Sequence, residues 1–149
     1  MKMLRPILAG ALAVTLATAC SDSTAPADVT AADLAGTWDA TSVVFTPDAG
    51  GIAVDVVLLG FGFEITFNAE GGYTATTDVP GEDPDVEIGT FTVANSVITL
   101  TPVGEDAETL TIDSLSGSTL VVTDSNAEFD FDDDDVEEPA NMTATMAKQ

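Results

Sequence analysis

The sequence predicts an all-β protein whose strands form one antiparallel up-and-down sheet. From Gly36 onward Thr, Val, Ile and Phe dominate, and turn residues return at short intervals. The segment from Phe61 to Phe67 alternates between apolar and polar residues, which is typical of a strand with one buried face. We predict eight strands, and closing them into a barrel removes the exposed edges of the sheet. A sandwich of two sheets is the alternative, because strand number alone does not separate the two folds.

Composition excludes several classes of function. The 149 residues include 26 Asp plus Glu, 3 Lys plus Arg, one Cys and no His. Without His there is no Ser-His-Asp or Cys-His catalysis and no imidazole metal ligand. Nucleic acid would be repelled, because proteins bind it through Lys and Arg. No motif supplies a nucleophile, a base or an electrophile, so we expect no enzyme; Glu64 is the only strand acid to nominate for acid–base chemistry.

The N-terminus has the pattern of an export signal, MKMLRPILAGALAVTLATAC. Lys2 and Arg5 precede an apolar run that is too short to span a bilayer, which takes about 20 residues. Small residues then lead to Cys20, an arrangement that resembles the lipobox of bacterial lipoproteins, although Ala17 stands where Leu is preferred. The resemblance implies that residues 1–19 are a signal peptide. It also implies that a lipid on Cys20 anchors the protein to a bacterial cell membrane, with its domain periplasmic or extracellular.

A signal peptide cut near Ala19, with Cys20 left as a free thiol, is the alternative. Residues 20–28 hold the lipidated Cys and a small, polar segment that predicts a flexible tether. The folded domain is then expected over residues 29–149. Once the signal is removed, Lys148 is the only base left against 26 acids, a net charge of −25.

The domain is predicted to begin with little more than one helical turn. Thr30 suits the N-cap, Asp33 suits the first turn, and Gly36 ends the helix. A first strand follows over residues 36–46 and ends in a Pro-Asp-Ala-Gly-Gly turn. Residues 52–59 are apolar on both faces, so a strand, a short helix and an exposed patch all stay open.

The remaining strands are joined mostly by short hairpins. Alternation and turn residues predict them over 61–67, 73–78, 88–93, 97–101, 108–114, 119–123 and 141–147. Their inward face is expected to carry Phe63, Ile65, Phe67, Tyr73, Ile98, Leu100, Leu110, Ile112, Leu120, Val122 and Met142. A small barrel is either filled by such side chains or holds one small ligand. We expect a filled core, with a cavity as the alternative.

A short motif opens the first strand. The residues Leu-Ala-Gly-Thr-Trp over 34–38 place Gly-x-Trp directly after the helical turn. This arrangement resembles the opening motif of lipocalins, and the hairpin rhythm over 34–147 is similar to that of small lipocalin-like lipoproteins of bacteria. The resemblance implies that Gly36 and Trp38 are the structural motif and that Trp38 plugs the closed end of the barrel.

One departure from lipocalins concerns the partner of this Trp. In lipocalins an Arg near the last strand packs over it, and no Arg follows Arg5 in this chain. Lys148 is the only candidate to replace it, as a cation–π partner of Trp38. Because terminal residues usually fray, we expect Lys148 to lie in solvent, with the ring contact as the alternative.

The acidic run from Glu128 to Glu138 is a candidate cation site. Ca²⁺ binds carboxylate oxygens, and Asp130, Asp132 and Asp134 match the first ligand positions of an EF-hand, but the rest of that motif is missing. We therefore expect a solvated, self-repelling loop at the barrel mouth, with Ca²⁺ binding as the alternative, and no other cofactor. The acidic segment over 80–87 has the same interpretation.

Two functions remain. We expect a binding module that takes a small apolar or neutral ligand through one open end, because an anion would meet an unfavourable field. The alternative is a structural or interaction lipoprotein with a filled core, whose acidic loops bind cations or a basic partner. A cavity of at least about 300 Å³ would favour the first function and a packed interior the second.

Overall fold

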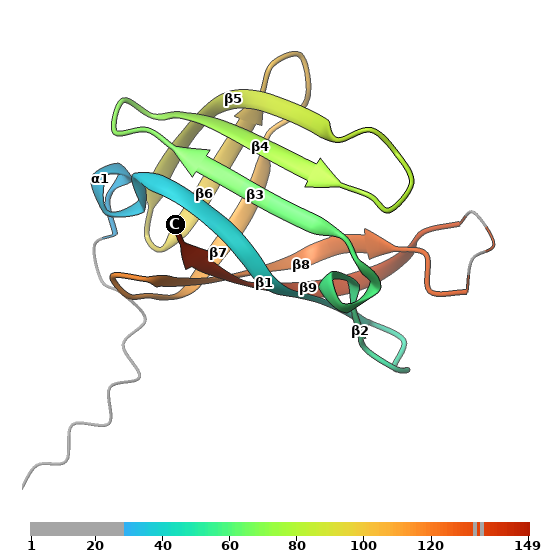
Figure 1. Ribbon diagram of the computed structural model, residues 1–149. Helices are drawn as coiled ribbons and strands as arrows, with labels where there is room; N and C mark the ends of the chain where they lie inside the picture. Colours follow the sequence, from blue (N-terminus) through green and yellow to red (C-terminus); the bar gives the residue numbers. More distant parts are fainter. Residues whose placement is uncertain (1–28, 133, 135) are drawn as a thin grey trace, which may run out of the picture.

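A computed structural model of the protein describes residues 29–132, 134 and 136–149 (Figure 1). The predicted signal peptide, the lipidated Cys20 and the tether lie outside the described residues. No helix within the described ranges is long and apolar enough to cross a membrane.

The described residues form nine strands in one antiparallel sheet, and all but the two-residue β2 close into an eight-stranded barrel. The strand order is β2-β1-β3-β4-β5-β6-β7-β8-β9, with a further pairing between β1 and β9. β1 (Gly36–Pro47) runs antiparallel to β9 (Glu138–Lys148), from Trp38 opposite Lys148 to Pro47 opposite Ala140. This pairing closes the sheet. The predicted up-and-down barrel is therefore confirmed, and the fold is not a two-sheet sandwich.

The strands between β1 and β9 follow one another around the barrel. They are β3 (Gly62–Phe67), β4 (Gly72–Asp78), β5 (Asp85–Ala94), β6 (Val97–Pro102), β7 (Glu108–Leu115) and β8 (Thr119–Phe129). The predicted bounds of three strands are too short, because β5 begins at Asp85, β8 continues to Phe129 and β9 begins at Glu138. Main-chain pairing, such as Phe129 opposite Glu138, extends these ladders into acidic sequence whose side chains reach solvent.

The ambiguous apolar segment contains a strand, a helix and exposed residues in succession. β2 (Val54–Asp55) pairs with β1, and a 3₁₀ helix, η1 (Val56–Leu59), follows it. The Asp55 carboxylate accepts hydrogen bonds from the Ser42 hydroxyl at 2.7 Å and from the main-chain N–H of Val43 and Val57 at 3.1 Å. Val56 packs into the core, whereas Ile52 and Leu58 are more than 80% exposed, at 86% and 83%.

The hydrogen bonds at Asp55 also set its ionisation. Burial by itself raises the pKa of this carboxyl, but the hydrogen bonds from Ser42, Val43 and Val57 outweigh it and lower the pKa below its ordinary value. The ionised side chain therefore holds η1 against β1.

A single helical turn, α1 (Ala31–Leu34), covers one end of the barrel (Figure 1). The Asp33 carboxylate accepts hydrogen bonds from the Thr30 hydroxyl and main-chain N–H at 2.6 and 2.9 Å, which lower the pKa of Asp33. The predicted cap and helical turn are confirmed, because Thr30 is the N-cap and Asp33 lies in the first turn, and Leu34 is fully buried in the barrel core. We call this the closed end; the turns β3–β4, β5–β6 and β7–β8 lie there as well.

Candidate functional site

Trp38 is buried beside α1 at the closed end. Its side chain has no exposed surface, and its indole Nε1 donates a hydrogen bond of 2.7 Å to the main-chain oxygen of Leu34. The turn α1 presents that oxygen, because its last carbonyls have no partner within so short a helix. Trp38 is thus buried against α1; its role with Gly36 as the structural motif of the fold stays a prediction.

Lys148 lies over this ring, with Nζ 5.1 Å from the ring centroid, so the expectation that it frays into solvent is wrong. Lys148 stands opposite Trp38 in the β1–β9 ladder, and its main-chain N–H donates to the Ser118 oxygen at 3.0 Å. Gln149 is also bound, to the Thr37 oxygen at 2.9 Å. The backbone of residues 148 and 149 is therefore hydrogen-bonded on both sides, to the β7–β8 turn and to β1.

Gly36 makes room for this contact. It has φ of +130°, a backbone conformation that side chains rarely adopt. A Cβ at this position would lie 2.7 Å from Cε of Lys148, well inside van der Waals contact. The Gly-x-Trp motif therefore combines a glycine of positive φ with the aromatic ring that Lys148 covers.

Between the closed end and the opposite, open end the barrel contains an apolar cavity of about 190 Å³. The inward positions predicted from the sequence are confirmed, since each is buried or packs against the core. The cavity is lined mainly by Val43, Phe45, Phe63, Ile65, Phe67, Ala75, Ile98, Leu110, Leu120, Val122, Met142, Ala144 and Met146. It is smaller than the about 300 Å³ of pockets for drug-sized ligands, but the expected filled interior is not observed either.

The cavity opens away from Trp38. Deep in the wall, Ile98, Leu120 and Val122 are buried, whereas Phe45 and Met142 are half-buried close to the open end. Sequence alternation missed Val43 and Phe45, because the register of β1 shifts between Ala40 and Ser42. That bulge turns the odd-numbered residues after it inward.

The open end carries most of the acidic loops (Figure 1). The connections β1–β2, β4–β5, β6–β7 and β8–β9 all lie there, because an up-and-down barrel alternates its turns between two ends. We call their acidic side chains the acidic rim: Asp48, Asp78, Glu82, Asp83, Asp85, Glu105, Asp106, Glu108, Glu128, Asp130, Asp132, Asp134, Glu137 and Glu138. The one base of the domain, Lys148, lies at the closed end.

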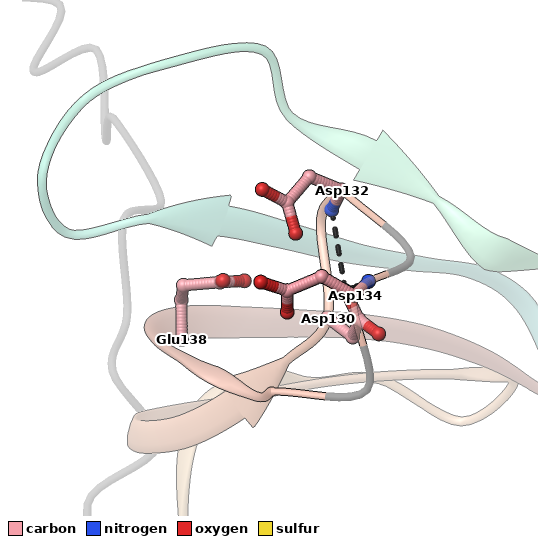
Figure 2. A group of neighbouring side chains, drawn as sticks. All are labelled: Asp130, Asp132, Asp134 and Glu138. Carbon is pink, nitrogen blue, oxygen red and sulfur yellow. Dashed lines mark hydrogen bonds between the residues drawn. The ribbon is translucent and has the colours of Figure 1, made fainter.

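The β8–β9 loop gathers four of these acids (Figure 2). Carboxylate oxygens of Asp130, Asp132, Asp134 and Glu138 all lie within 4.8 Å of one another. Asp130 accepts hydrogen bonds from the main-chain N–H of Asp132 and Asp134 at 3.2 and 3.3 Å. The structure thus brings together the three predicted cation ligands and adds Glu138, which the β8–β9 pairing returns to the loop.

Repulsion between these carboxylates raises the pKa of Asp132. The charge of Asp134 is the main cause that raises the pKa of Asp132, and slight burial and the charges of Glu138 and Asp130 add to it. The cluster offers oxygen atoms to a hard cation, but its outer members are exposed and exposed acids also cluster without an ion.

A family model described as "Lipocalin-like domain" matches residues 34–122. The chain belongs to this lipocalin-like family. Among solved structures, a lipocalin-like protein from Bacteroides uniformis is 15% identical, with a TM-score of 0.49 over 78% of this chain and 99% of that chain. An uncharacterized protein from Bacteroides eggerthii is 11% identical, with the same TM-score and the same coverage. No curated protein matches the sequence significantly.

In this lipocalin-like domain three aromatic rings connect the cavity wall to the outer surface. Phe45 lines the cavity and stacks on Phe129, with ring centroids 4.7 Å apart and planes inclined by 19°. Phe129 contacts Phe131 edge-on at 4.9 Å. The sequence placed Phe129 and Phe131 in an acidic run, and only the extension of β8 reveals their contact with the cavity wall.

Phe131 in turn lines a groove of about 570 Å³ between the β1–β2 and β8–β9 loops, which we call the rim groove. Its apolar members include Ile52, Val54 and Pro139, and its acids are Asp48, Asp132 and Glu138. Glu64, the acid nominated for catalysis, is not part of this groove: it is exposed on β3 opposite Asp39 and is among the residues that line the barrel cavity.

Proposed function

We propose that this lipocalin-like protein is a non-enzymatic binding module that holds the apolar part of a small ligand in its barrel cavity. The observation that carries this proposal is the apolar cavity of about 190 Å³. An engineered apolar cavity of about 150 Å³ stays dry and binds benzene, so the volume suits one ring or a short chain. The strongly negative domain disfavours an anionic ligand.

Cavity burial by itself supports only weak binding. An apolar group that loses about 150 Å² of exposed surface gains about 4 kcal/mol. That free energy corresponds to a Kd of about 1 mM. A ligand that binds more tightly must therefore make contacts outside the cavity.

A pair of matched variants tests the cavity. Ala75 lines it from β4, and the neighbouring Thr74 is exposed on the outer face of the same strand. Ala75→Leu fills the cavity, whereas Thr74→Leu adds the same side chain outside. With toluene at about five times its Kd, thermal melting should show about 1 kcal/mol of stabilisation for the wild type and for Thr74→Leu.

Ala75→Leu should lose that stabilisation while its far-UV circular dichroism stays that of a folded barrel. If toluene stabilises Ala75→Leu as strongly as the wild type, the cavity is not the binding site. If toluene stabilises none of the three proteins, the proposed function is wrong.

Export as a lipoprotein is part of this proposal. The residues that support it are the apolar signal pattern and Cys20 directly after small residues. The described chain begins at Val29 beside the closed end, so an anchor on Cys20 would attach the domain through that end. Mass spectrometry of the mature N-terminus tests this: a diacylated Cys20 supports it, and a free Cys20 thiol contradicts it. Cys20→Ser should release the protein from the membrane fraction.

The alternative function, acidic loops that bind cations, is favoured by the four carboxylates of the β8–β9 loop. Thermal melting with Ca²⁺, compared with Na⁺ at equal ionic strength, tests it. A shift specific to Ca²⁺ that Asp130→Asn abolishes would move the function to this loop.

A further inference from the structure

The ligand's chemistry can be narrowed further, on the assumption that the proposed cavity function holds. The aromatic series from Phe45 to Phe131 leads from the cavity wall to the rim groove. A ligand that fills the cavity and continues along these rings reaches a surface where apolar and acidic side chains alternate. Phe131 is half-buried there, beside Asp132 and Glu138.

The rim groove suits a positively charged group for two independent reasons. An aromatic ring face attracts an ammonium, by about 0.5–1 kcal/mol at an exposed site. Asp48, Asp132 and Glu138 line the same groove and supply negative charge. The Phe131 N–H donates to Glu138 Oε2 at 3.0 Å, which holds that carboxylate beside the aromatic residue.

The charge of the whole domain also favours a cation at the open end. The acidic rim surrounds the open end, and Lys148 is held at the closed end. The field at the mouth of the cavity is therefore attractive to cations and repulsive to anions, and it weakens as salt is added.

We propose that the ligand is a small cationic amphiphile, whose apolar part occupies the barrel cavity and whose ammonium group lies in the rim groove against Phe131, Asp132 and Glu138. A neutral molecule of the same shape uses only the cavity. An anionic one meets the acidic rim. A simple metal cation uses neither the cavity nor the aromatic series.

Three probes with the same six-carbon chain separate these cases: hexyltrimethylammonium, 1-hexanol and hexanoate. Calorimetric titration of the purified protein at about 10 mM salt should give at least tenfold tighter binding of the ammonium than of the alcohol, and weaker binding of hexanoate than of either. At about 300 mM salt the preference for the ammonium should shrink, because the rim is screened.

Two pairs of variants that remove equal charge test whether the preference for the ammonium probe arises at the rim groove. Asp132→Asn with Glu138→Gln removes two charges from the rim groove, and Glu70→Gln with Asp113→Asn removes two exposed charges toward the closed end. The groove pair should reduce the affinity for hexyltrimethylammonium at least fivefold and leave that for hexanol unchanged. The control pair should retain most of the preference.

The outcomes distinguish this inference from the function on which it rests. Equal affinity for all three probes, abolished by Ala75→Leu, leaves the cavity function intact and overturns the cationic ligand. A preference for ammonium that both variant pairs reduce equally overturns the groove as its site. If no probe binds, both proposals fail.

Discussion

Lys148 covers the buried ring of Trp38, with Nζ 5.1 Å from the ring centroid, and so joins the end of the last strand to the start of the first. The contact lies at the seam where β1 meets β9 and the barrel closes. The aliphatic part of the lysine packs beside Gly36 while its ammonium remains over the indole. Lys148 thus contacts both residues of the Gly-x-Trp motif, although it lies more than 100 residues away in the sequence.

Replacing this lysine should weaken the seam. Lys148→Ala is expected to lower the free energy of unfolding by about 1 kcal/mol, because it removes the cation–π contact and the packing of the stem. Urea denaturation monitored by Trp38 fluorescence measures it. Lys148→Arg, which keeps both charge and stem, is the control. Equal stability of Lys148→Ala and the wild type would show that the contact contributes nothing.

Gly36→Ala should be more harmful than its small size suggests. The φ of +130° opposes any side chain here, and the flexible end of Lys148, whose Cε would lie 2.7 Å from the new Cβ, must move aside; we expect a loss of about 1–3 kcal/mol. In a double-mutant cycle, Lys148→Ala should recover the steric part only. A Gly36→Ala protein as stable as the wild type would contradict the backbone argument.

Asp55 should make stability depend on acid pH. Its pKa is lowered in the fold, so the ionised form is stabilising above the ordinary value of 3.8, and that stability is lost as pH falls through the lowered pKa. Asp55→Ala is expected to cost about 1–2 kcal/mol at pH 7 and much less at pH 2. Urea denaturation of both proteins at the two pH values is the measurement. A cost that is the same at both pH values would exclude the carboxylate as the cause.

Ionised Asp132 should destabilise the fold, whereas ionised Asp55 stabilises it. Its pKa is raised, mainly by Asp134, so its charge is destabilising above that pKa and harmless once the carboxyl is protonated. Asp132→Asn should therefore raise Tm at pH 7 in low salt, and the gain should disappear at about 1 M NaCl or below pH 3. Asp113→Asn, which lies outside the cluster, serves as the control. A Tm gain that persists in high salt would point to a cause other than repulsion.

The sequence by itself determined the features that depend on chain neighbours. Alternation predicted inward residues of β3, β4 and β6 to β9, although not the buried Phe91 of β5, and Thr30 with Asp33 predicted the short helical turn. The Gly-x-Trp residues carried the resemblance to lipocalins, and the composition gave the strongly negative net charge. These features are local, since a hydrogen-bonded cap or a period of two residues involves only a few consecutive positions.

Only the tertiary structure decided the features that depend on distant residues. The bulge after Ala40 turns Val43 and Phe45 inward, although a strict period of two from Trp38 would place Ser42 and Val44 there. Closure of β1 on β9 holds Lys148 over the ring, although chain ends usually fray. The barrel cavity of about 190 Å³ is likewise lined by strands far apart in the chain. The acidic loops also meet at one end only because distant strands pair. The physical reason is that barrel closure sets the register and the interior volume together, and no stretch of neighbouring residues contains that information.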